Sequence, residues 1–226
     1  MTRTAEDFSP GRARLMALYE DLLALYGAQS WWPADSPFEV AVGAILTQNT
    51  NWSNVERALE RLKAAEALGC EAILAMDVAR LAELIRPAGY YNLKAQRLRN
   101  LCRYLSEMGG LQGLRALSCA QAREGLLGVK GVGPETADDI LLFALDRPVF
   151  VIDAYTRRLL RRQGLARGDE PYEVLRQGFE QALPADVRLF KEYHALIVEH
   201  AKRACRKRAD CAVCGLSEHC LRLEVE

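Results

Sequence analysis

The chain has 226 residues, half of them hydrophobic, and its 30 lysines and arginines balance 30 aspartates and glutamates. This composition supports a folded core and excludes a disordered or low-complexity chain. No apolar run approaches the roughly 20 residues that cross a bilayer, and no secretory signal opens the sequence, so we expect a cytoplasmic protein without a membrane partner.

Helical periodicity runs through nearly the whole chain. Leucines at three- and four-residue steps predict a first helix around 15–25. Ser36 and Glu39, with Pro37 between them, predict a capping box and a helix start before the apolar segment 38–48, and Ser118 with Gln121 predicts a second capping box. Further helices are predicted over 54–63, 81–87, 93–110, 120–127, 134–146, 154–164, 171–183 and 191–205.

The only strand candidate is short. It covers residues 147–155, RPVFVIDAY, and no alternating apolar pattern elsewhere persists long enough to predict a sheet. The sequence therefore predicts an all-α protein. Arginines become frequent after residue 148, and a basic face of this kind can hold a phosphate backbone although the net charge is zero.

A glycine-rich turn separates two of the predicted helices. Gly131 and Gly133 permit positive φ and leave backbone amides unshielded, and Pro134 begins the next helix. Exposed amides beside a helix start bind anions such as a DNA phosphate. The acids at the start of this helix complement its dipole, and we expect them to face solvent; they are Glu135, Asp138 and Asp139.

Four of the seven cysteines lie within sixteen residues, in the pattern C-x5-C-x2-C-x5-C. They are Cys205, Cys211, Cys214 and Cys220. In a reducing compartment such a group indicates a metal site rather than disulfides. Four thiolates at this spacing suit either an iron–sulfur cubane or a tetrahedral zinc.

Asp153 follows an apolar run and precedes a predicted helix. Its position alone indicates a helix N-cap. Together with the segment LLGVKGVGPETADDILL, the segment VIDAYTR and the four cysteines, however, it resembles the helix–hairpin–helix DNA glycosylases of the endonuclease III superfamily. The resemblance covers roughly residues 35–220, and one departure is the first cysteine gap of five residues, where the family usually has six.

The resemblance implies two helical lobes. A six-helix barrel with the helix–hairpin–helix motif would span 36–147, and residues 1–35 with 148–226 would form a lobe that carries a [4Fe–4S] cluster on the four cysteines. It implies a monomer that binds double-stranded DNA containing a damaged base, in the bacterial nucleoid, with Asp153 at the mouth of the groove that takes the DNA.

The resemblance also implies roles for individual residues. Asp153 would be the catalytic carboxylate that stabilises an oxocarbenium-like sugar and orients water. Glu135 stands where bifunctional members have the lysine that forms a Schiff base, so we expect a monofunctional enzyme, with Lys130 as the nearest alternative amine. The expected DNA contacts are Gln48, which would fill the gap left by a flipped base, with Lys94, Gly131, Val132, Gly133 and Thr136.

The substrate is the less specific part of the resemblance. The segments WWPADSPFEVAVGAILTQNTNW and GVKGVGPETADDILLFALDRPVFVIDAYTRRLL are most similar to endonuclease III-like 3-methyladenine DNA glycosylases, which implies alkylated purines. Trp52 and Tyr155, with Trp31 and Trp32, are candidate walls of the base pocket. Removal of oxidised pyrimidines with residual lyase activity, removal of mismatched adenine, and lesion binding without catalysis remain alternatives.

Overall fold

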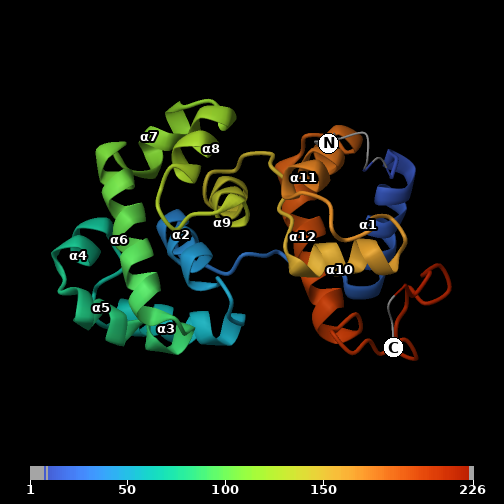
Figure 1. Cartoon of the computed structure of the whole chain (residues 1–226), viewed down its shortest axis with the longest axis horizontal. Helices are drawn as coiled ribbons and strands as arrows, with labels where there is room; N and C mark the ends of the chain where they lie inside the picture. Colours follow the sequence, from blue (N-terminus) through green and yellow to red (C-terminus); the bar gives the residue numbers. More distant parts are fainter. Residues whose placement is uncertain (1–7, 9, 224–226) are drawn as a thin grey trace. The chain divides into compact units, whose positions relative to one another are not determined.

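The computed structural model describes residues 8 and 10–223, and no β-strand occurs among them. The prediction of an all-α protein is confirmed. The chain divides into two compact units, which Figure 1 shows with their helices labelled. We call Ala34–Arg147 the hairpin unit, and Met1–Pro33 together with Pro148–Glu226 the aspartate unit.

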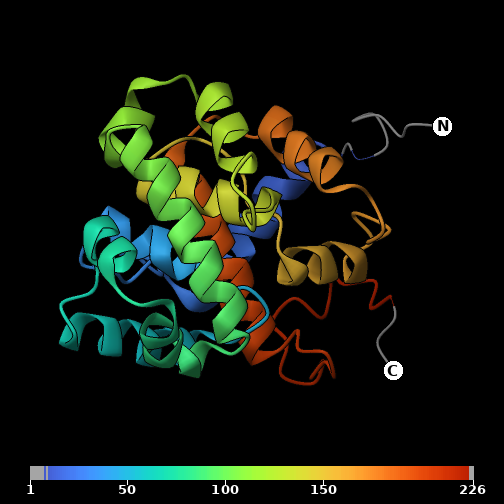
Figure 2. The same cartoon turned by 60° about the vertical axis from the view of Figure 1, so that its left-hand side comes forward.

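The hairpin unit is built around a long helix, α6. Helices α4 and α5 pack along α6, as Figure 2 shows, and α2 packs against the π-helical segment η3 and against α3. Helix α2 is buried along nearly its whole length, as its apolar sequence predicts. The helices are α2 (Pro37–Leu46), α3 (Trp52–Ala64), α4 (Cys70–Ala75), α5 (Val78–Leu84), η2 (Arg86–Ala88), α6 (Tyr91–Glu107), α7 (Gly110–Ala116), α8 (Cys119–Leu127), α9 (Pro134–Asp139) and η3 (Ile140–Ala144).

The two predicted start signals behave differently in detail. The Ser118 hydroxyl accepts a hydrogen bond from the Gln121 amide and the Gln121 side chain accepts one from the Ser118 amide, so this capping box is complete. The Ser36 hydroxyl caps α2 by accepting from the Glu39 amide at 3.1 Å. The Glu39 carboxylate, however, accepts from the Asp35 amide, one residue earlier than a capping box requires.

Three short elements depart from the predicted helices. Helices α4 and α7 were not predicted, and α7 begins at Gly110, where the helix predicted over 93–110 was expected to end. The predicted helix 134–146 divides into α9 and η3, where the backbone widens into a π-helix. The strand candidate forms no strand: residues 147–153 have no regular secondary structure, and α10 begins at Ala154.

The aspartate unit packs two helices, α1 (Arg12–Tyr26) and α10 (Ala154–Arg162), against α12 (Val187–Arg203), while α11 (Tyr172–Ala182) contacts α1. Its core is aromatic: Phe150 and Phe179 stack with ring centroids 4.0 Å apart, and Tyr193 meets both edge-on. The Tyr193 hydroxyl donates to the Leu15 carbonyl at 2.8 Å. Because Phe150 belongs to this core, the core holds the segment 148–152 in place just before Asp153. No helix in the described ranges is long and apolar enough to span a membrane.

Candidate functional site

Asp153 is half-buried at the N-terminus of α10. Its Oδ1 accepts two hydrogen bonds, from the Thr156 amide at 2.7 Å and from the Thr156 hydroxyl at 2.8 Å. Within the described chain Oδ2 accepts none. Asp153 is thus an N-cap, as its position in the sequence indicates, and the same two bonds hold the carboxylate in one orientation with one oxygen left for a ligand or water.

Two tryptophans stack next to each other in the same unit. The rings of Trp31 and Trp32 have centroids 5.0 Å apart and are inclined by 26°, and both side chains are half-buried. Trp31 also stacks on His194 of α12, at 5.8 Å and 20°. The pair offers a flat apolar surface of the kind that binds a planar ring.

The predicted turn lies between α8 and α9. Gly131 has a φ of +101° that only glycine adopts readily, and the Val132 amide donates to the Val129 carbonyl at 3.0 Å. The Val132 amide is therefore engaged within the turn. Gly133 and Pro134 lie exposed where α9 begins, as does the side chain of Lys130 just before the turn.

Gln48 connects the end of α2 to this turn. Its amide nitrogen donates to the Gly131 carbonyl at 3.1 Å and to the Thr136 hydroxyl at 2.9 Å, while its amide oxygen accepts from Arg97. Thr136 is 5% exposed, so its hydroxyl faces inward. In this structure the Gln48 amide holds the turn, and entry into a duplex would have to break these bonds. Arg97 was not predicted as part of this network.

Lys94 is the predicted DNA contact that the structure contradicts. The residue is 1% exposed, and its Nζ donates to the carbonyls of Leu46 and Ala88, both at 2.7 Å. Burial, with a smaller effect from the charge of Arg97, lowers the pKa of Lys94 to about 8. The ammonium group joins the ends of α2 and η2 instead of facing a phosphate.

The acids of α9 do not all face solvent. Glu135 is exposed as expected, but Asp138 is fully buried and accepts from Arg123 at 2.7 and 3.0 Å, one bond on each oxygen. Asp139 is also buried. The expectation was wrong for these two residues, and for Asp138 the reason is that Arg123 of α8 supplies the partner that a buried carboxylate requires.

Trp52 and Tyr155 are both half-buried and both have side-chain partners close by. The Trp52 indole donates to Glu56 at 2.8 Å, and the Arg158 guanidinium lies 5.2 Å from the centre of the Tyr155 ring. Tyr155 belongs to the aspartate unit and Trp52 to the hairpin unit.

The four clustered cysteines line one small cavity beside α10 and α12. Burial and the other cysteines raise the pKa of Cys214 and Cys220. The buried guanidinium of Arg162 donates to Cys205 Sγ at 3.2 Å and to the carbonyls of Arg206 and Lys207. In the described chain no three cysteine, histidine or acidic side chains stand at metal-ligand spacing, so the geometry alone does not define a metal centre.

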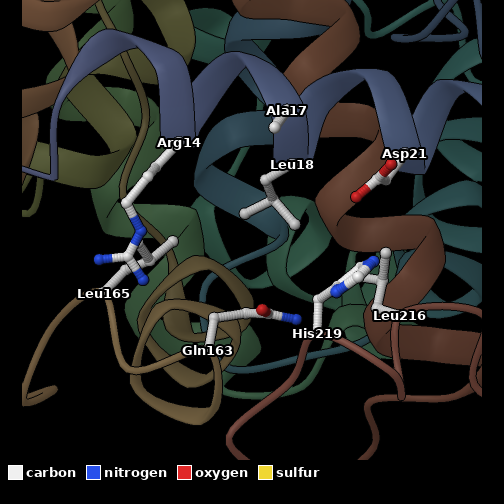
Figure 3. Close-up of a pocket in the computed structure, with 8 residues that line it drawn as sticks. All are labelled: Arg14, Ala17, Leu18, Asp21, Gln163, Leu165, Leu216 and His219. Atoms are coloured by element: carbon white, nitrogen blue, oxygen red, sulfur yellow. The ribbon is translucent and has the colours of Figure 1, made fainter.

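A larger pocket of about 350 Å³ lies elsewhere in the aspartate unit. Figure 3 shows Arg14 and Asp21 of α1 on one side of it and Gln163 and His219 on the other. None of the predicted catalytic, DNA-contacting or metal-ligating residues lines this pocket, so we do not assign the active site to it.

Tyr90 is a candidate that the sequence did not reveal. Its side chain is 69% exposed, whereas the other large hydrophobic residues that are exposed in the described chain are leucines and a valine. Tyr90 also has a φ of +45° just before α6. Non-glycine residues in this left-handed region are uncommon and often lie at functional sites. The only signal in the sequence is the segment Gly89–Asn92, which reads as an ordinary turn.

Comparison with known proteins identifies the family. Residues 42–185 match the model of the HhH-GPD superfamily of base excision DNA repair proteins. A protein of Methanocaldococcus jannaschii, provisionally named a DNA repair glycosylase, is 50% identical over 90% of this chain and 94% of its own length. The crystal structure of 3-methyladenine DNA glycosylase (MagIII) from Helicobacter pylori bound to 1,N6-ethenoadenine is 32% identical, with a TM-score of 0.72 over 85% of this chain and 97% of that one.

An endonuclease III in a non-covalent complex with DNA shares the fold, at 20% identity and a TM-score of 0.79 over 92% of this chain and 94% of that one. The family match and the 50% identical relative cover most of the chain. The chain is therefore a DNA N-glycosylase of base excision repair, an endonuclease III-like member of the HhH-GPD superfamily.

Proposed function

We propose that this glycosylase is monofunctional and removes alkylated purines from duplex DNA, with Asp153 as the catalytic carboxylate. The observation that carries the proposal is the fixed carboxylate: Thr156 holds Oδ1 through two hydrogen bonds and leaves Oδ2 open. A carboxylate that needs no reorganisation stabilises developing positive charge more effectively than a mobile one.

The reaction breaks the bond between the sugar C1′ and the base nitrogen. As the base leaves with the bonding electrons, positive charge builds on the sugar, and the Asp153 carboxylate would stabilise it. Water then adds to C1′ and gives up a proton, which Asp153 can accept as a general base. Alkylated purines that carry a positive charge leave readily, so one carboxylate is sufficient.

The tryptophan pair supports the choice of substrate. Trp31 and Trp32 lie in the same unit as Asp153 and present stacked aromatic faces, which attract a flat cationic ring through dispersion and cation–π effects. The 3-methyladenine glycosylase that resembles this chain was crystallised with another modified adenine, 1,N6-ethenoadenine. Tyr155, which contacts Arg158, and Trp52, which donates to Glu56, remain further candidates for the base pocket.

The absence of lyase activity follows from Glu135. The residue is exposed near the start of α9, and a carboxylate cannot form an imine with the sugar aldehyde. Lys130 is the exposed amine nearest in sequence. Borohydride should trap no covalent adduct with abasic DNA, and an adduct that disappears in Lys130→Gln would contradict the monofunctional assignment.

We assign DNA contact in the hairpin unit to the exposed end of the turn. Gly133 and the start of α9 would bind a phosphate, with Lys130 adding charge. Tyr90 is a second candidate, because an exposed aromatic side chain can stack between bases and stabilise a distorted duplex. The Gln48 amide would support the turn from behind.

The four clustered cysteines would hold the [4Fe–4S] cluster that the family resemblance implies. Two features fit: the donors line a single cavity, and Arg162 donates to Cys205 Sγ, which favours a thiolate. When bound, a cluster with four protein ligands supplies order and charge rather than a site for substrate. Exposed basic residues flank the first cysteine and would contact phosphates; they are Lys202, Arg203, Arg206, Lys207 and Arg208.

A base-release assay on matched duplexes tests the proposal. The wild-type enzyme should release 3-methyladenine, and Asp153→Asn should lower the single-turnover rate by about a hundredfold or more while duplex affinity persists. Asn can still cap α10, which makes this variant a control for folding. Release of an oxidised pyrimidine or a mismatched adenine instead would overturn the substrate class, and binding without any release would overturn catalysis.

A further inference from the structure

One buried histidine contacts both parts of the proposed active site in the aspartate unit. His194 lies on α12, is 3% exposed, and stacks on Trp31 with ring centroids 5.8 Å apart. Trp31 in turn stacks on Trp32. The flat face of the imidazole therefore packs against the Trp31 ring.

The edge of the same ring reaches the aspartate segment. His194 forms a hydrogen bond with the backbone of Val151, two residues before Asp153, and the charge of Asp153 acts on the imidazole. Burial lowers the pKa of His194, against the smaller opposing effects of Asp153 and the Val151 bond. The ring is thus neutral near pH 7, and its N–H donates to the Val151 carbonyl.

Helix α12 has a second contact with the tryptophan segment. The Glu192 carboxylate accepts from the backbone amides of Gln29 and Ser30, the latter at 3.3 Å. These bonds fix the chain just before Trp31, and His194 fixes the indole itself. Glu192 and His194 of α12 therefore hold both the segment that carries the tryptophans and the segment that ends in Asp153.

We propose that His194 is a positioning residue for base excision, which keeps the Asp153 carboxylate and the Trp31 ring in one fixed arrangement. The inference rests on the proposed roles of Asp153 and Trp31. Neither an aliphatic nor a simple aromatic side chain could replace the histidine, because the position requires a flat face toward Trp31 and an N–H toward Val151. Misplacing catalytic groups by about 1 Å can cost about a hundredfold in rate.

Two variants separate the two contacts. His194→Phe keeps a flat ring but loses the N–H, and His194→Gln keeps a donor but loses the ring. Leu196→Ala is the matched control, since Leu196 is fully buried on the same helix and points away from the side of His194. We would measure the single-turnover release of 3-methyladenine, the affinity for a duplex with an abasic analogue, and the thermal midpoint.

Both His194 variants should release base about tenfold to a hundredfold more slowly than wild type, with duplex affinity unchanged. Leu196→Ala should lose thermal stability but retain its rate at temperatures well below its midpoint. Wild-type rates in either His194 variant, or an equal loss of rate in Leu196→Ala, would overturn the positioning role.

Tryptophan emission separates this inference from the proposed function. In a Trp52→Phe background only Trp31 and Trp32 report, and each His194 substitution should shift their emission whereas Leu196→Ala should not. If wild type released no base from any duplex, the proposed function would fail on that result alone. Unchanged emission in both His194 variants would overturn the inference whatever the activity.

Discussion

A buried lysine joins two helix ends in the hairpin unit. Lys94 donates to the carbonyls of Leu46 and Ala88, and its pKa is lowered to about 8, chiefly by burial. The folded protein thus favours the neutral amine more than the unfolded chain does, whose lysine titrates near 10.5. Below pH 8 the folded and unfolded states both carry the charge, and the full free-energy cost of burying the charged amine lowers stability. Above pH 10.5 both states are neutral and this cost is absent.

Lys94→Met should lower the free energy of unfolding by about 2–4 kcal/mol at pH 7, because two buried carbonyls lose their donor. The difference from wild type should widen as the pH rises from 8 to 10, since wild type gains stability over this range and the variant lacks the titrating group. Urea unfolding of both proteins at four pH values measures this difference in the free energy of unfolding. A difference that stays constant or narrows would contradict the lowered pKa.

Lys63→Met is the matched control for this titration. Hydrogen bonds to Asp35, then Glu39, raise the pKa of Lys63, so its stabilising contribution is present up to pH 10 and is lost only above that. Its side chain is 40% exposed, and we expect a small effect at pH 7. The difference between Lys63→Met and wild type should not widen between pH 8 and 10.

Residue roles that depend on local sequence were predicted better than those that depend on distant partners. Asp153 and Ser118 cap helices because the residues they need lie three positions on. Asp138 was misread because its partner, Arg123, lies on another helix. His194 gave no signal, since a single histidine in an apolar helix is typical of a core position and Val151 lies 43 residues earlier in the sequence.

Two of the three glycines between α8 and α9, Gly131 and Gly133, lie in different environments. At Gly131 the φ is +101°, and an added Cβ would lie 2.4 Å from Arg97 Cγ. At Gly133 the φ is −97°, and an added Cβ would meet nothing within 4 Å. The fold thus requires glycine at position 131, whereas Gly133 leaves the backbone accessible.

Alanine substitutions should separate stability from DNA binding. Gly131→Ala should destabilise the hairpin unit by about 1–3 kcal/mol through backbone strain and the displaced Arg97 side chain. Gly133→Ala should leave the thermal midpoint unchanged yet weaken duplex binding several-fold, because the methyl group covers amides that would face a phosphate. Equal affinity in Gly133→Ala and wild type, measured at one salt concentration, would rule out a phosphate contact here.

Among the elements, the long amphipathic helices were predicted, whereas two short ones, α4 and α7, were missed. Helix α6 and helix α12 have 17 residues each, enough turns for the apolar period to show. Helices α4 and α7 have six and seven residues, too few for periodicity to be distinguished from a loop. The change from α9 to the π-helix η3 depends on packing against α2, which no local pattern encodes.

The molecule as a whole has no net charge, so its attraction to DNA must come from local surfaces. The exposed lysines and arginines around Cys205 form one such surface in the aspartate unit. Lys202 and Arg203 end α12, and Arg206, Lys207 and Arg208 lie on the loop that follows, residues 204–223, which contains no helix among its described residues. We expect this loop to gain most of its order from the proposed cluster, because it has no helix of its own.

Loss of the proposed cluster should therefore act on one unit only. Wild-type protein prepared without oxygen should contain about four iron atoms per chain, and Cys214→Ser should lose them. Hydrogen exchange should then become faster in residues 204–223 and in α10, which is linked to the loop through Arg162, while Ala34–Arg147 keeps its protection. Cys119→Ser, at a cysteine outside the loop, is the control and should keep its iron. One zinc per chain in place of iron would identify the alternative metal. Unchanged hydrogen exchange of residues 204–223 in Cys214→Ser would mean that the loop is ordered without a metal.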